Sequence, residues 1–115
     1  MDSKDCELCK EINQMSKEFR TAIRKTMSKA QIAEVGYEII ASLRQLKLDV
    51  YRLCIQEDES QRKYDKQTVE YRLDWIKILI DECIEDNILS MKGTYNIVQP
   101  RKRLMESIDN LKAIS

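Results

Sequence analysis

The sequence lacks histidine altogether and contains few of the residues that shape turns. Among its 115 residues are 2 glycines and 1 proline, and 6% of the residues are aromatic. All-β and nucleotide-binding α/β folds need glycine and proline at turns and phosphate loops, so this composition favours an all-α protein. Histidine is the commonest general base and metal ligand. Its absence predicts a protein that is not an enzyme and that holds no metal and no cofactor.

A charge excess and long apolar runs are also missing. The 20 basic and 20 acidic residues give no net charge, which argues against a protein that wraps nucleic acid by bulk electrostatics. No apolar run approaches the roughly 20 residues that span a bilayer. The chain is charged from Asp2 onward and has no apolar stretch near Met1, so we expect no secretory signal. These features predict a cytoplasmic protein without membrane contact, whose 4 cysteines stay reduced.

Apolar residues recur at steps of three or four in four segments of the chain. This period predicts helices over about residues 5–26, 29–55, 61–86 and 91–113. Four such helices joined by short connections favour an all-α, up-and-down four-helix bundle that forms one domain over residues 1–115. The residues expected to face the core are Leu8, Ile12, Met15, Phe19, Ile23, Met27, Ile32, Val35, Ile39, Leu43, Leu46, Val50, Leu53, Val69, Leu73, Ile76, Ile80, Cys83, Leu104, Ile108 and Leu111.

The helix boundaries carry their own signals. Ser28 and Gln31 match the capping box that begins a helix, and Asn87 can take the left-handed conformation that ends one. Asp58 or Ser60 can cap the third helix. Pro100 either kinks a last helix that begins near residue 91 or stands at the first position of a short helix that runs to about Ala113. We favour the kinked helix, because a short one would leave the ends of its long neighbours uncovered.

The second and third helices each carry a further apolar stripe away from the expected core. By the 100° advance per residue, a second face of the second helix, next to the core face, holds Tyr37, Ile40, Leu48, Tyr51 and Ile55. A lone surface helix would be polar there. Either another part of the chain covers these stripes, or they are an oligomer or partner interface. The residues predicted for such an interface are Tyr37, Ile40, Tyr51, Tyr64, Tyr71, Trp75 and Ile78.

Basic residues are clustered despite the neutral total. If the first and last helices lie antiparallel to their neighbours, two clusters can form a basic rim that touches phosphate groups, although ordinary charged surface explains them as well. Cys6 and Cys9 have the C-x-x-C spacing of half a zinc site or of a redox motif, but a second pair is missing. The predicted nucleic-acid-binding residues are Lys17, Arg20, Arg24, Lys25, Lys29, Arg101, Lys102 and Arg103.

The order of these segments resembles a known family. A capped amphipathic helix over residues 27–40 leads to a third helix with the run Arg72–Ile80, followed by Asn87-Ile-Leu-Ser-Met-Lys92, Tyr95 and Leu104-Met-Glu-Ser-Ile108. This pattern is similar to the four-helix-bundle accessory proteins of diversity-generating retroelements, the Avd family. It also resembles the related bundle proteins encoded in intervening sequences of bacterial large ribosomal RNA genes.

The resemblance implies a function without catalytic residues. Proteins of that family assemble into barrel-like homo-oligomers, a pentamer in the best-known case, and bind the retroelement's reverse transcriptase and its template RNA. This chain is then expected to support mutagenic cDNA synthesis, with its second apolar stripes as subunit or partner contacts and its basic clusters as contacts to RNA, cDNA or polymerase. The alternative is a helical adaptor or regulator that binds only protein, which the neutral net charge favours.

Overall fold

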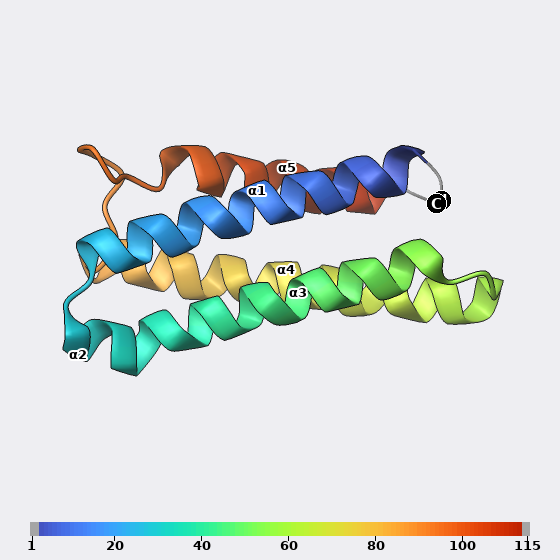
Figure 1. Cartoon of the computed structure of the whole chain (residues 1–115), viewed down its shortest axis with the longest axis horizontal. Helices are drawn as coiled ribbons and strands as arrows, with labels where there is room; N and C mark the ends of the chain where they lie inside the picture. The colour runs from blue at the N-terminus through green and yellow to red at the C-terminus, as the bar shows by residue number, and fades with distance from the viewer. Residues whose placement is uncertain (1–2, 114–115) are drawn as a thin grey trace.

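The computed structural model describes residues 3–113, and over this range the chain forms four long antiparallel rods without a β-strand (Figure 1). The second rod, residues 29–55, is helical without a break, but residues 32–36 are π-helical and the rest are α-helical. No helix in the described range is both long and apolar enough to cross a bilayer. The elements in chain order are α1 (Ser3–Thr26), α2 (Lys29–Gln31), the π-helical segment η1 (Ile32–Gly36), α3 (Tyr37–Ile55), α4 (Glu59–Glu85) and α5 (Val98–Ala113).

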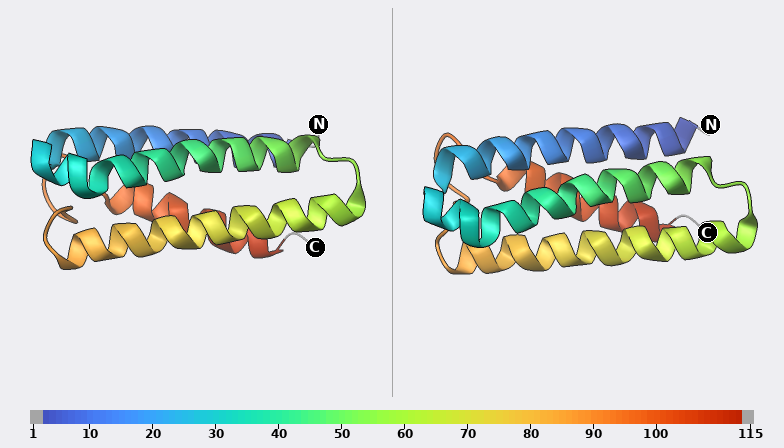
Figure 2. Two further views of the ribbon diagram at one scale, coloured as in Figure 1. Left: turned by 90° about the horizontal axis from the view of Figure 1, so that it is seen from below. Right: turned by 60° about the horizontal axis from the view of Figure 1, so that its bottom comes forward.

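The rods make an up-and-down bundle, as predicted. Helix α1 packs against α3 and α5, and α4 packs against the same two helices from the opposite corner. Figure 2 shows that each rod reverses the direction of the one before it. The bundle is 44 Å long and about 20 Å across, with principal extents of 44 × 22 × 19 Å.

The core runs along the whole axis of this bundle. The residues predicted to face the core from the first, third and last helices are all buried. Five predicted core residues of α3 are buried as well: Ile39, Leu43, Leu46, Val50 and Leu53. Ile32 and Val35 are partly buried at the edge of the same cluster. Each fully buried aliphatic side chain contributes about 1.5–3 kcal/mol relative to an exposed one, so this cluster is the main source of stability.

Side-chain caps set the helix ends where the sequence predicts them. The Ser28 hydroxyl accepts the Gln31 backbone N–H at 3.2 Å, and the Gln31 side chain accepts the Ser28 N–H at 2.9 Å. Asp58, rather than Ser60, caps α4 by accepting the Gln61 N–H at 2.8 Å. Asn87 has the left-handed φ of 59° and closes the end of α4. These bonds satisfy backbone groups that have no partner inside the helix.

The π-helical segment is a feature that the periodicity does not show. Residues Ile32–Gly36 form it, directly against the end of α1. A Cβ atom added to Gly36 would lie 3.2 Å from Ile23 Cγ2 and 3.2 Å from Met27 Sδ. Glycine therefore lets the backbone of the second rod approach α1 at this turn.

The prediction of a kinked last helix beginning near residue 91 is wrong. Gly93 has a φ of 95°, and the Asn96 side chain accepts the Val98 N–H at 3.1 Å, so the helix begins only at Val98. Pro100 is its third residue, where a missing N–H costs nothing. Leu89 and Ile97 are buried and fill the end of the bundle that a longer helix was expected to cover.

Two buried carboxylates set the register of α3 against α4. Asp49, 4% exposed, accepts a hydrogen bond from Arg72 Nε at 3.2 Å and another from Gln45 Nε2 at 3.0 Å. Asp65, also buried, accepts from Gln56 Nε2 at 3.2 Å and from the Gln61 side chain at 3.1 Å. Both pairs match the same antiparallel alignment of the two helices. Buried charges require such partners, so other alignments are unfavourable.

We call these contacts of Asp49 and Asp65 the α3–α4 seam. They predict that mutating Arg72 costs more stability than mutating Asp49. Arg72→Met leaves the buried Asp49 carboxylate without its cation and should lower the free energy of unfolding by about 3 kcal/mol. Asp49→Asn should cost only about 1 kcal/mol, because the Arg72 side chain is 31% exposed and stays hydrated. Urea unfolding of both variants and of the double variant measures the difference. Equal losses in the two single variants would contradict it.

Candidate functional site

The apolar stripe of α3 is exposed along most of its length. Tyr37 is 64% exposed, and Leu48, Tyr51 and Ile55 are exposed to a similar extent. Ile40 is the exception: it is 5% exposed and belongs to the core cluster. Its prediction as an interface residue is therefore wrong. Three residues advance a helix by about 300°, so Ile40 lies only about 60° from Tyr37, at the border between the stripe and the core-facing side of α3, and the core cluster covers it.

The stripe of α4 is exposed as well. Tyr71 is 75% exposed, and Tyr64, Ile78 and Trp75 are also exposed, with Trp75 the least at 37%. They share one face of α4 at steps of seven, four and three residues. No other segment of the described chain covers this stripe. Among the described residues, the explanation by intramolecular cover is therefore wrong.

The two stripes lie on adjacent helices at a shared level. Arg72 contacts Asp49 across the α3–α4 seam, and these residues lie within one turn of Tyr71 and Leu48 on their respective helices. Aromatic side chains are enriched in the cores of protein interfaces. We call this set the α3–α4 apolar surface and define it as Tyr37, Leu48, Tyr51, Ile55, Tyr64, Tyr71, Trp75 and Ile78.

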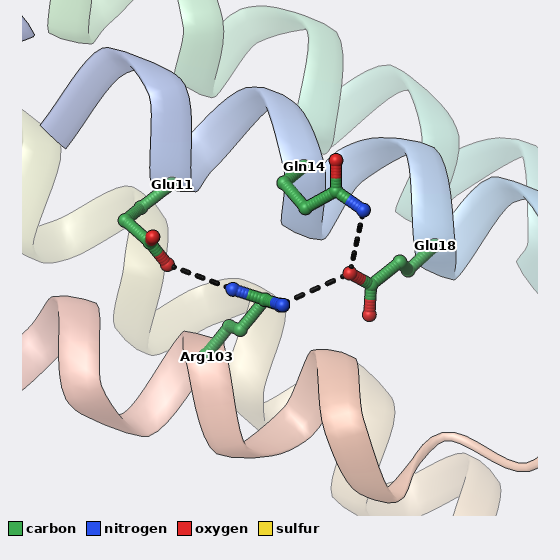
Figure 3. A network of polar contacts seen from close by, with 4 residues as sticks. All are labelled: Glu11, Gln14, Glu18 and Arg103. Atoms are coloured by element: carbon green, nitrogen blue, oxygen red, sulfur yellow. Dashed lines mark hydrogen bonds and ion pairs between the residues drawn. The ribbon is translucent and has the colours of Figure 1, made fainter. Parts of the chain in front are cut away.

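The structure does not join the two basic clusters into one rim. Arg103 reaches from α5 to α1, with its Nη1 at 3.2 Å from Glu11 Oε2 and its Nε at 3.0 Å from Glu18 Oε1 (Figure 3). The Gln14 amide donates to the same Glu18 oxygen at 2.9 Å. Arg101 pairs instead with Asp81 of α4 at 3.1 Å. Of the three basic residues predicted on α5, only Lys102 remains exposed without an ion pair to a described residue.

The basic residues of α1, together with Lys29 of α2, are more accessible. We call them the α1 cluster. Lys17, Arg24 and Lys29 are exposed and make no ion pair with any residue that the structure describes. Arg20 Nε donates to the Ser16 carbonyl at 3.4 Å. Lys25 Nζ lies 6.0 Å from the centre of the Tyr95 ring, within cation–π range. The α1 cluster is therefore the basic surface best placed to meet phosphate groups.

A shallow pocket of about 360 Å³ adjoins this cluster. It lies between α1 and the segment before α5, and Lys17, Tyr95 and Gln99 line it together with Gln14 and Asn96. Tyr95 appears in the sequence only as part of the family pattern, and the pocket exists because the loop folds back onto α1. A sequence contains no local signal for such a contact.

Shifted pKa values are found for Asp81, Arg103 and Cys83. Partial burial raises the pKa of Asp81, but hydrogen bonds and charges of Lys77 and Arg101 lower it more, so the net shift is downward. Desolvation lowers the pKa of Arg103, but its two glutamate partners outweigh it and raise the value. Burial, helped by the nearby charges of Asp86 and Glu82, raises the pKa of Cys83.

Of the two cysteines in the C-x-x-C spacing, the structure describes the side chain of Cys9. The Cys6 side chain lies outside the described residues, and the described partner of Cys9 is Cys54 of α3, with 3.3 Å between the sulfur atoms. Among the described residues, no group of three or more Cys, Asp and Glu side chains is arranged to hold a metal ion.

The fold and these surfaces define an all-helical bundle with an exposed apolar surface on one pair of helices and a basic surface on another. Comparison with known protein families, curated proteins and solved structures found no match to this chain. The inference of function therefore starts from the residues and their geometry.

The Asp81 contacts predict a pH-dependent stability difference. Asp81→Asn should lower the free energy of unfolding at pH 7 by about 0.5–1 kcal/mol, the range of an exposed ion pair with more than one partner. Because the folded pKa lies below the ordinary 3.8, the stabilisation is complete above that value and disappears as the pH falls through the folded pKa. Urea unfolding between pH 7 and 2.5 measures this. The control Asp109→Asn should show no such pH dependence.

Proposed function

We propose that this protein is a non-enzymatic accessory protein that binds a reverse transcriptase of a retroelement and supports mutagenic cDNA synthesis. The α3–α4 apolar surface carries the proposal. Tyr71, Trp75 and Tyr51 are large, semi-rigid side chains that gain free energy when a partner removes them from water. The resemblance to the Avd family supplies the identity of the partner, and the bundle that it implies agrees with the observed fold.

Self-assembly uses the same surface in this proposal. Two exposed stripes on adjacent helices allow one copy to present α3 to α4 of the next, a head-to-tail contact that closes into a ring when the rotation permits. The pentamer comes from the resemblance. A closed ring covers both stripes of every copy, so the polymerase would take the place of a neighbouring copy on this surface.

Template RNA or cDNA is proposed to bind through α1 rather than through both clusters. Lys17, Arg24 and Lys29 are exposed cations that no described carboxylate neutralises. Arg101 and Arg103 already pair with carboxylates, so contacting phosphate would require those pairs to break. We therefore assign the α5 arginines mainly to holding the bundle together.

A second function is favoured by the same ion pairs. An adaptor that binds protein only needs the α3–α4 apolar surface and no basic rim. The internal neutralisation of Arg101 and Arg103, together with zero net charge, fits this reading. The two functions differ in whether nucleic acid binds to the folded protein.

The protein-binding proposal predicts a defined effect of two polar substitutions. Tyr71→Gln with Trp75→Gln should weaken self-association and reverse transcriptase binding at least tenfold, while circular dichroism shows an unchanged helix content. Light scattering after gel filtration and calorimetric titration with the polymerase measure these effects. The control is Val98→Gln, an exposed apolar residue on α5 outside the surface. Unaltered association in the double variant would refute the role of this surface.

The nucleic-acid proposal predicts a position-dependent charge effect. Changing Lys17, Arg24 and Lys29 together to Gln should lower RNA affinity at low salt at least tenfold and reduce the salt dependence of binding by about three counterions. A matched triple variant of Lys10, Lys63 and Lys112 removes the same charge from other exposed sites. Equal losses in both variants would indicate bulk attraction only. A wild-type chain that does not bind RNA would support the adaptor.

A further inference from the structure

Two thiols from distant parts of the chain touch at one end of the bundle. Cys9 Sγ of α1 and Cys54 Sγ of α3 are 3.3 Å apart, and 45 positions separate them in the sequence. Cys54 is buried at 7% exposure, and Cys9 is partly buried. Cys9 is therefore the sulfur that a small reagent in solution reaches first. The tertiary fold brings the two sulfur atoms into contact.

Both cysteines lie near helix ends, where the two sulfur atoms can move close enough to form a bond. A disulfide bond is about 2.05 Å long, so the atoms must move together by roughly 1.2 Å. Cys9 lies in the second turn of α1, and Cys54 is the residue before the last one of α3. Helix ends open at lower free energy than helix centres, and the side chains can rotate as well. Cys83, on α4, is buried in the core.

We propose that Cys9 and Cys54 are a modification site at which a low-molecular-weight disulfide, such as oxidised glutathione, is reduced and an intramolecular disulfide forms. The Cys9 thiolate attacks the reagent, which forms a Cys9–glutathione mixed disulfide and releases one glutathione thiolate. The Cys54 thiol loses its proton and attacks the Cys9 sulfur, which releases the second glutathione. Two protein thiols are oxidised, and one glutathione disulfide is reduced to two thiols.

The bond would join α1 to the end of α3. It closes a long loop that contains the turn between the first two rods and the whole of α3 up to Cys54, which restricts the unfolded chain. Tyr51 and Ile55 of the α3–α4 apolar surface flank Cys54 in sequence, so oxidation also restrains one end of that surface. The proposed chemistry stands independently of the proposed function, since it needs neither polymerase nor RNA.

Mass spectrometry of the folded full chain tests the proposal. After treatment with oxidised glutathione, the wild type should lose the mass of two hydrogens, and proteolytic peptides should be cross-linked between Cys9 and Cys54. Cys54→Ser and Cys54→Ala should instead retain glutathione on Cys9. Cys6→Ser and Cys83→Ser are the matched controls and should oxidise as the wild type does. The oxidised protein should unfold at a temperature roughly 5 °C or more higher, and a reductant should reverse this.

Other outcomes would overturn the proposal. A Cys6–Cys9 cross-link, or glutathione that persists on Cys9 while Cys54 stays reduced in the wild type, would show that the geometry does not favour this pair. The same oxidation in concentrated urea provides a reference, because an unfolded chain has no preference for the Cys9–Cys54 pair. If the folded chain shows no enrichment of this cross-link over the unfolded chain, the tertiary contact does not direct the reaction.

Discussion

The buried polar seam between α3 and α4 is the constraint on which the surfaces of this protein depend. Asp49 and Asp65 are charged groups on the inner side of their helices, and they are stable there only while Arg72 and the surrounding glutamines reach them. An apolar core alone tolerates small rotations and shifts of a helix. Two hydrogen-bonded carboxylates in one register do not, and they thereby determine which residues of both helices face solvent.

The exposed stripes follow from that constraint. With Arg72 held at Asp49, Tyr71 and Trp75 cannot turn inward without breaking the seam. Their exposure to water is unfavourable for an isolated monomer, and the proposed contact with a second copy or with a polymerase would remove it. The seam therefore links the stability of the monomer to the presentation of its proposed binding surface.

The seam keeps apolar residues exposed, whereas the ion pairs of α5 draw basic residues into the packing between helices. Arg101 and Arg103 connect α5 to α4 and α1, where Asp81, Glu11 and Glu18 neutralise them. A cluster that is conspicuous in the sequence thus becomes part of the packing between helices. The basic surface that remains exposed is smaller and lies on α1 and at the start of α2, next to the pocket at Tyr95.

The sequence by itself determined the class of fold, the four core stripes and the caps at Ser28 and Asn87. These features depend on helical periodicity and on bonds between residues a few positions apart. Only the tertiary structure decided the inward turn of Ile40, the late start of α5, the pairing of Arg103 with Glu18, and the contact of Cys9 with Cys54. Each depends on how helices distant in the sequence meet, because a local pattern specifies the face of a helix but not the neighbour that covers it.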